Sequence, residues 1–421
     1  MINNFNDLFL ILFQTTLIFI VLYFIYRKQI FSLFDPLFFY ILTQSFSIEL
    51  GILEIKDFGY LFNFLLCQVF FAWGFSSLFK SSKNAQNIDD SKLSLGSKEL
   101  KFWTLFTVFG FILVLIANAY LISVQGVILF LDDPTTSKVA AFEGGTGIGA
   151  VRRINWGLLN LVNLSVIFVY LKSRKRIFLL MLLILIIISV SGGAKSSLLV
   201  YVTILALLGQ FKTIKGTLVF KKIDKVKIPL VLSGLVLSIF IIGANDIGLG
   251  DSVLGLGVRF LYFGDIIFYY YNEDAVRHFQ QLGFFDFLNY ELNPFLGILR
   301  IAPYLTPLSF DMVQYSFSHN EILEVVKGPN LPYYVKGHIF FGGYGALVYS
   351  FIVGIFIAYI RNLLFEKHST YSKYIIILYF NLSVFSFAQD FAFELSVLFD
   401  TLLFSLIPVF LSLIFMYPIK K

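Results

Sequence analysis

The chain has 421 residues, of which 58% are hydrophobic and only 14% charged, and its net charge is +6. A soluble domain cannot bury that much apolar surface, because its surface limits how much can lie inside. The composition therefore excludes an ordinary soluble protein. The excess positive charge lies in short loops between apolar runs, so no nucleic-acid partner is expected.

Long uncharged runs predict membrane-spanning helices. About 20 apolar residues cross ~30 Å of hydrocarbon as a helix, and these runs lack the alternation of a membrane barrel. The first run is preceded by Asp7 and by no basic residue, so we expect a retained span rather than a cleaved signal peptide. We predict an all-α polytopic protein, one membrane domain over residues 1–421, with about eleven spans in a range of ten to twelve. The predicted spans are 8–26, 34–53, 58–79, 102–122, 154–171, 177–194, 197–211, 228–247, 343–361, 374–392 and 396–417.

The basic residues predict the orientation of these spans. Short loops rich in Lys and Arg stay on the cytoplasmic side. Eleven spans, with the N-terminus outside and the C-terminus inside, place six basic segments in the cytoplasm, and these hold 22 of the 32 basic residues. The segments are 27–28, 80–101, 172–176, 212–227, 361–373 and 420–421.

This topology leaves a long segment, residues 248–342, on the outer side. A connection of this length is unusual unless it has a function. It contains nine acidic residues, five basic residues and three of the four histidines. Aromatic residues crowd its first part, so we expect it to be partly helical and to lie against the membrane. These aromatic residues are Phe260, Tyr262, Phe263, Phe268, Tyr269, Tyr270 and Tyr271.

Some basic residues lie outside, against the orientation bias, and therefore need a reason. Lys195 stands between two short apolar stretches, in the sequence Ser191-Gly192-Gly193-Ala194-Lys195-Ser196-Ser197. It is either a lysine that extends to the interface at a tight turn or an anion-binding residue with small neighbours. The other outer basic residues are Lys56, Lys138, Arg152, Arg153, Arg259, Arg277, Arg300, Lys327 and Lys336.

Four of the outer arginines are candidate anion-binding residues. Arg152 and Arg153 follow a glycine-rich stretch, residues 143–149, and the alternative for them is ordinary interfacial arginines on a flexible loop. Arg259 and Arg300 have apolar flanks, which predicts charges on a half-buried surface, and the alternative for each is a solvated side chain. The planar guanidinium suits phosphate oxygens better than an ammonium group.

Three residues of the outer loop are candidates for proton transfer. His319 and Glu321 lie in a polar stretch of an otherwise aromatic loop, and histidine titrates near neutral pH. The alternative is a helix start, in which Ser318 is the N-cap and Glu321 its capping-box partner. His338 lies just before a predicted span and is either catalytic or structural. Because the only cysteine is Cys67 and no strong metal-binding cluster is found, we predict neither a metal nor another cofactor.

Three short motifs, in this topology, resemble a known group of membrane enzymes. They are Ser191-Gly192 followed by Lys195-Ser196 between two short spans, Ser318-His319-Asn320 followed by Leu323-Glu324, and Phe341-Gly342-Gly343-Tyr344-Gly345-Ala346-Leu347 entering a span. The chain is similar in these features to bacterial O-antigen polymerases, the Wzy-type oligosaccharide repeat-unit polymerases, and to the related O-antigen ligases. Lys195 stands where the family has arginine, and the interval from His319 to Gly345 is longer than in the ligases.

The resemblance implies a multi-pass, GT-C-like enzyme of the bacterial cytoplasmic membrane. Such an enzyme transfers a growing glycan from undecaprenyl diphosphate to the next lipid-linked repeat unit at the outer face. Lys195, Arg152, Arg153, Arg259 and Arg300 would then contact the diphosphate, and His319, Glu321 or His338 would supply the base. The implied partners are undecaprenyl-diphosphate-linked oligosaccharides, membrane lipids, a chain-length regulator and a flippase. The alternatives are an O-antigen ligase, a membrane glycosyltransferase that uses a polyprenyl-phosphate sugar, and a flippase or transporter.

Overall fold

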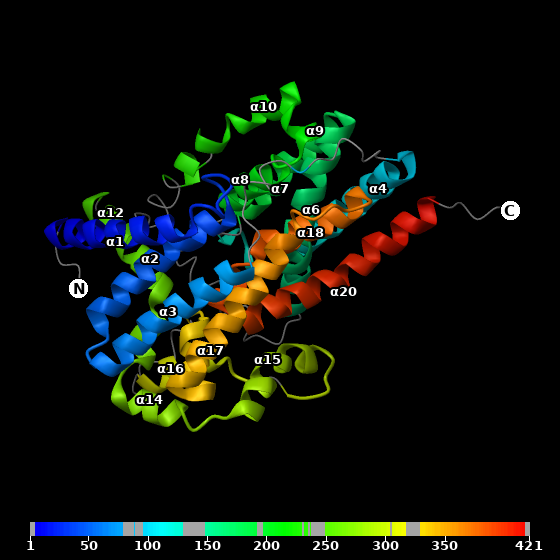
Figure 1. Ribbon diagram of the computed structural model, residues 1–421. Helices are drawn as coiled ribbons and strands as arrows, with labels where there is room; N and C mark the ends of the chain where they lie inside the picture. Colours follow the sequence, from blue (N-terminus) through cyan, green and yellow to red (C-terminus); the bar gives the residue numbers. More distant parts are fainter. Residues whose placement is uncertain are drawn as a thin grey trace. The chain divides into compact units, whose positions relative to one another are not determined.

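Helices form the whole regular structure of the described part of the chain. The computed structural model describes residues 5–78, 88, 96–128, 148–191, 197–229, 231–234, 236, 249–303, 305–316 and 329–416. Among them, only the isolated bridge between Ile88 and Phe211 pairs extended backbone. The predicted all-α class is therefore confirmed for these residues. The chain divides into two compact units, which are described separately (Figure 1).

The described helices include eight that are long and apolar enough to cross a membrane, which makes this a multi-pass membrane protein. The predicted spans 177–194 and 197–211 are shorter helices, α7 (Ile177–Ser191) and α8 (Ser197–Leu208), and most of 228–247 lies outside the described residues. The eight are α1 (Phe5–Tyr26), α2 (Pro36–Glu54), α3 (Phe58–Leu78), α4 (Ser97–Gln125), α6 (Ile148–Ser173), α17 (Tyr333–Leu363), α18 (Tyr371–Ser383) continued by α19 (Ser386–Gln389), and α20 (Phe391–Met416).

The first unit comprises residues 1–84, 242–363 and 383–396. It holds the predicted outer loop, which is a chain of short helices in its described part, as expected. These helices are α12 (Leu249–Leu261), the 3-10 turn η3 (Tyr262–Gly264), α13 (Ile266–Tyr270), α14 (Glu273–Phe279), α15 (Phe284–Ile298) and α16 (Leu308–Ser316). Of the aromatic residues expected against the membrane, Tyr262 and Phe263 are exposed, whereas Tyr270 and Tyr271 are buried.

Helices α3 and α17 form the centre of this unit and run side by side. A side chain added to Gly74 would overlap the carbonyl of Phe351, so the two backbones approach as closely as small residues allow. The amide of Asn63 donates to the carbonyl oxygen of Gly343 over 2.9 Å near one end of the pair. At the other end, Asn362 donates to the carbonyl oxygen of Leu78 over 2.8 Å. The two helices are therefore parallel over the length of α3.

Helix α17 is folded in two at Gly342. This glycine has φ 69° and ψ −177°, a conformation that a residue with a side chain rarely adopts. A Cβ on Gly337 would lie 2.9 Å from the Cα of Ala346, although residues nine apart in a straight helix are about 13 Å apart. The chain therefore reverses at Gly342, and a re-entrant arm (residues 333–341) packs against a spanning arm (residues 343–363).

The re-entrant arm reaches the level of the middle of α3. The rings of Tyr333 and Phe71 stack with centroids 4.7 Å apart, and Tyr334 meets Phe64 at 4.9 Å. The hydroxyl of Tyr333 also donates to the side-chain oxygen of Gln68. The spanning arm matches the predicted span 343–361. The end of the predicted outer loop, however, enters the helix bundle, where every residue from 331 to 340 is buried.

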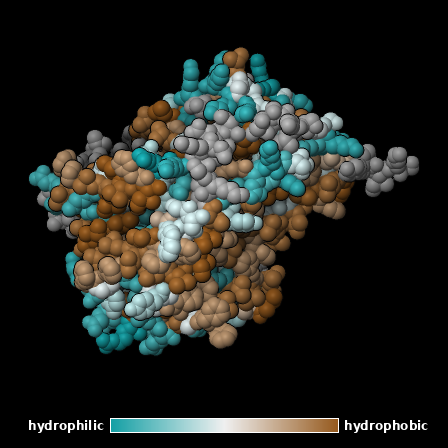
Figure 2. Space-filling view, viewed as in Figure 1, coloured by the Kyte–Doolittle hydropathy of each residue, from teal (hydrophilic) through white to brown (hydrophobic). Residues whose placement is uncertain are grey.

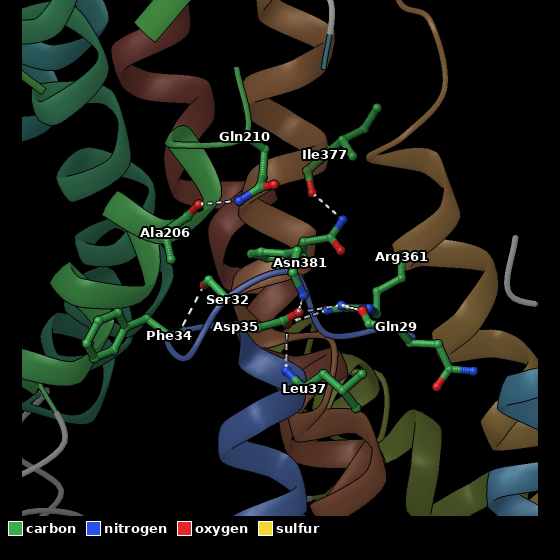
Figure 3. A network of polar contacts seen from close by, with 11 residues as sticks. Gln29, Ser32, Phe34, Asp35, Leu37, Ala206, Gln210, Arg361, Ile377 and Asn381 are labelled. Carbon is green, nitrogen blue, oxygen red and sulfur yellow. Dashed lines mark hydrogen bonds and ion pairs between the residues drawn. The ribbon is translucent and has the colours of Figure 1, made fainter. Parts of the chain in front are cut away.

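A buried ion pair fixes the opposite end of α17 (Figure 3). Arg361 is completely buried and donates to both carboxylate oxygens of Asp35, each over 2.7 Å, and to the carbonyl oxygen of Gln29 over 2.9 Å. Asp35 also caps α2, because one of its oxygens accepts from the backbone N–H of Leu37 over 2.8 Å. The arginine assigned to a cytoplasmic loop is thus a structural residue.

The second unit comprises residues 85–241, 364–382 and 397–421. It contains α4, α6, α7, α8, α9 (Lys212–Lys215), α10 (Leu218–Asp224), most of α18 and most of α20. Helices α6 and α20 pack closely at Gly157, where an added side chain would lie 2.7 Å from the carbonyl carbon of Asp400. Thr401 donates to the carbonyl oxygen of Gly157 over 2.7 Å at the same contact.

Candidate functional site

The re-entrant arm carries a lysine into the interior of the first unit. Lys336 is 2% exposed, and its ammonium group forms an ion pair with the carboxylate of Glu291, which is also buried. A charge at this depth is costly unless it is paired, so an ionisable pair inside a membrane protein indicates a functional site. The two residues belong to different elements, α17 and α15, and the fold back at Gly342 makes the contact possible.

A cavity of about 200 Å³ lies beside this pair, within the same unit. Lys336, Glu291 and Asp390 line it together, so one cation and two carboxylates meet there. Asp390 stands between α19 and α20, and its carboxylate accepts from the backbone N–H of Phe393 over 3.1 Å. The remaining wall consists of Tyr290, Asn293, Pro294, Leu305, Thr306, Pro307, Leu308, Ser309, Leu331, Phe340, Ala392, Phe393 and Ser396.

Asn293 holds one wall of the cavity in place. This buried amide donates to the carbonyl oxygen of Pro303 over 2.9 Å and accepts from the backbone N–H of Leu305 over 2.8 Å. Both bonds tie the connection after α15 back onto the helix. The segment that supplies Leu305, Thr306 and Pro307 is therefore fixed beside Glu291 by a single side chain.

Burial and a neighbouring charge act on Glu291 in opposite directions. Burial raises the pKa of this carboxyl above its usual range, and the neighbouring Lys336 ammonium partly offsets the rise. One of its two oxygens, Oε2, has no hydrogen-bond partner among the described residues. A buried acceptor without a partner is unfavourable and is free to take a proton or a ligand hydroxyl.

His338 lies two residues beyond Lys336 but occupies a different environment. Its Nδ1 lies 2.6 Å from the hydroxyl of Tyr270 and 3.2 Å from the side-chain amide of Gln280. The rings of Tyr60 and Tyr271 also pack around it, and the side chain is buried. The structure therefore places His338 in a tyrosine cluster and not on the cavity wall, and its catalytic role stays a prediction.

The predicted arginines fall in different places. Arg259 and Arg300 belong to the first unit and are exposed, and Arg300 has a left-handed backbone with φ 54°. Neither lines the cavity; burial nevertheless lowers the pKa of the Arg259 guanidinium, which fits the expected half-buried setting for that residue. In the second unit, Arg153 pairs with the buried carboxylate of Asp400 at 3.0 Å, and the buried Arg152 contacts the side-chain oxygen of Gln125 at 3.4 Å.

Lys195, His319 and Glu321 lie outside the described residues, so their predicted roles stay predictions. The structure adds Glu291 and Asp390, which the sequence analysis did not single out. The sequence signal for Lys336 was its place on the outer side, against the orientation bias. For Asp390 the comparable sequence signal was a carboxylate near the end of an apolar run. For Glu291 the sequence contained no such signal.

No known family, curated protein or solved structure matches the chain, so the resemblance rests on the sequence motifs alone.

Proposed function

We propose that this protein is a glycosyltransferase of the bacterial cytoplasmic membrane that polymerises undecaprenyl-diphosphate-linked oligosaccharide repeat units at the outer face. The proposal includes eleven spans, with the N-terminus outside and the C-terminus inside, and a GT-C-like fold. One observation carries it: the predicted outer loop turns into the bundle and buries Lys336 and Glu291 beside a cavity. A cation and a carboxylate at that position meet the needs of a reaction with an anionic lipid donor.

In this proposal Lys336 contacts the donor diphosphate and Glu291 is the base. The acceptor hydroxyl gives its proton to the Glu291 carboxylate and attacks the sugar carbon that carries the diphosphate. The bond from that carbon to oxygen breaks, and the lipid diphosphate leaves with the electron pair. Lys336 stabilises the negative charge on this leaving group. A base works best with a pKa near the operating pH, and burial moves the pKa of Glu291 upward in that direction.

The pairing of these two residues links donor binding to base activation. When the ammonium group of Lys336 turns toward the diphosphate, Glu291 loses its neighbouring positive charge. The proton affinity of the carboxylate then rises, because only Lys336 offsets the effect of burial. His319, Glu321 and His338 remain predicted proton-transfer residues, and Lys195, Arg152, Arg153, Arg259 and Arg300 remain predicted diphosphate contacts.

The test is the length of lipid-linked glycans in cells that carry variants of the chain. Lys336→Ala and Glu291→Gln should leave single repeat units on the lipid carrier, with polymer compared per amount of protein in the membrane because loss of one partner of a buried pair also lowers stability. Lys336→Arg should retain part of the activity because the charge is kept. Glu273→Ala is the matched control, since it removes an exposed carboxylate from an exposed ion pair with Arg277. Normal polymer from Lys336→Ala would refute the proposal, and long unattached chains in cells without the gene would identify a ligase.

Transport of a lipid-linked glycan is a second candidate, and the break in α17 favours it. Discontinuous helices and buried ion pairs that face a cavity are typical of membrane transporters. The two functions differ in where repeat units accumulate. In cells without the gene, loss of a polymerase leaves single units on the outer leaflet, whereas loss of a flippase retains them on the cytoplasmic leaflet.

A further inference from the structure

Helix α15 has three faces of different chemistry. Phe285, Leu288 and Leu292 share one face at helical spacing, and all three are exposed, Phe285 to 83%. Asp286 and Asn289 form a narrow exposed polar edge beside them. Glu291 and Asn293 are buried, and both line the cavity. A helix with an exposed apolar face, a polar edge and a buried side is typical of one that lies in the interface of a membrane.

The contacts of α15 show that it lies beside the membrane-spanning part of the unit. The ring of Phe287 packs on Tyr349 with centroids 5.8 Å apart, and on Phe340 and Phe341 at 5.5 and 5.2 Å. Tyr349 lies six residues into the spanning arm of α17, which is about 9 Å along the helix. Helix α15 is therefore level with the outer part of the span rather than beyond its end.

The exposed surface of the spanning arm is also apolar next to α15. Tyr344, Val348 and Ile352 recur every four residues along the arm, and all are exposed, Tyr344 to 92%. In a chain that crosses a membrane, such a stripe faces lipid. Figure 2 shows hydrophobic side chains over the region where Figure 1 places α15, and hydrophilic ones over α14. Helix α15 and the spanning arm, which meet at Phe287 and Tyr349, therefore each carry an exposed apolar stripe.

The rim of the cavity has the same character. Leu305, Thr306, Pro307 and Phe393 line the cavity and are exposed, Phe393 to 49%, and Thr306 is the one polar residue among these four. A mouth that opens only to water would be expected to carry polar side chains at its edge. Apolar exposed side chains beside Lys336 and Glu291 instead suit a ligand with a hydrocarbon tail and a charged head.

We infer that α15 is embedded in the outer leaflet, with Phe285, Leu288 and Leu292 among the acyl chains, and that the cavity is entered from the lipid past Leu305 and Phe393. Embedding in lipid does not depend on the reaction. The entry route rests on the proposed function, because it names the lipid-linked glycan as the ligand whose head reaches Lys336 while its tail stays in the membrane.

The embedding is tested with spin labels in vesicles of phosphatidylethanolamine and phosphatidylglycerol. Single cysteines are placed at Leu288, Leu292, Asn289 and Arg277 of a Cys67→Ala chain, since Cys67 is the only cysteine. Labels at Leu288 and Leu292 should collide with oxygen and be shielded from a water-soluble nickel complex, and the label at Arg277, an exposed residue of α14, should show the reverse. A label at Leu288 that is open to nickel would overturn the inference, whatever the activity.

The entry route is tested with a matched pair of charge substitutions. Leu292→Lys places a charge on the apolar face of α15, and Asn289→Lys places the same charge on its polar edge. Leu292→Lys should abolish polymer while the variant protein keeps its normal abundance in the membrane. Asn289→Lys should make normal polymer. If both keep wild-type polymer while Lys336→Ala has none, the function stands and lipid-side entry is wrong. If a spin label at Leu288 still collides with oxygen in the Leu292→Lys variant, helix α15 remains embedded in lipid. The loss of polymer is then due to blocked entry of the lipid-linked glycan.

Discussion

At the scale of single residues, the buried Lys336–Glu291 pair is expected to affect both stability and function. Removing one partner of a buried ion pair leaves an uncompensated charge, which costs about 3–5 kcal/mol. Lys336→Met should therefore lower the stability of the purified protein by that amount. The Glu273→Ala control should cost less than about 0.5 kcal/mol, because its pair with Arg277 is solvated. Thermal unfolding in detergent measures both.

The double variant separates the charge from the packing. Lys336→Met with Glu291→Gln removes both partners of the ion pair and leaves only Asp390 without the nearby cation, so it should recover part of the loss seen for Lys336→Met alone. The loss of stability caused by Lys336→Met, relative to the wild-type protein, should also be smaller at pH 5 than at pH 8. A carboxyl whose pKa is raised by burial binds its proton more tightly in the folded protein, and stability then falls as the pH rises. Equal losses at both pH values would contradict an ionised Glu291.

Asp265 gives a second residue-scale prediction. Burial raises the pKa of this carboxyl to about 7, although the backbone N–H of Ile266 lowers it in part. The folded protein therefore holds a proton that the unfolded chain releases above pH 3.8, and stability should fall between about pH 4 and pH 7. Asp265→Asn should flatten this fall and stabilise the protein by roughly 2–4 kcal/mol at pH 8. Unfolding temperatures of the two proteins across this pH range provide the measurement.

At the scale of elements, the reversal at Gly342 decides where the site residues lie. Gly342→Ala should cost about 1–3 kcal/mol, because an alanine at positive φ is strained even though no atom lies within 4 Å of its Cβ. It should also reduce polymer, since the re-entrant arm carries Lys336. Gly96→Ala is the control: it too has open space around the new Cβ, but its φ is −59°. Similar losses for both variants would exclude backbone strain as the cause.

The contact between α3 and α17 sets the depth of the re-entrant arm. Gly74 and Gly354 each face a backbone carbonyl of the other helix, from Phe351 and Phe71 respectively. Alanine at either position must separate the two helices, because backbone atoms cannot move aside as a flexible side chain can. These two glycines therefore serve the packing of the helices and not the proposed reaction.

At the scale of the whole molecule, the orientation in the membrane is open to a direct test. Reporter fusions or labelled cysteines at Arg174 and Lys222 should report the cytoplasm, and those at Arg277 the outer side. The reason is that 22 of the 32 basic residues lie in the predicted inner loops. A cytoplasmic result at Arg277 would place the cavity on the wrong side for the proposed reaction.

The sequence by itself determined that this is a helical multi-pass membrane protein. Hydropathy and charge are local properties. Whether an apolar run favours lipid over water depends on its own residues and not on the rest of the chain. The predicted span 343–361 and the structural spanning arm agree for this reason. His338 and Lys336 were visible as unusual residues because their positions conflict with the local pattern.

Only the tertiary structure decided which unusual residues meet. Glu291 and Lys336 are 45 residues apart, and their contact needs both the reversal at Gly342 and the packing of α15 on α17. Composition gives no signal for such a pair, because its free energy depends on burial and geometry that arise only when distant segments pack. The same reason explains why Arg153 is paired with Asp400 and Arg361 with Asp35, although the sequence shows each only as a basic residue near the end of a span.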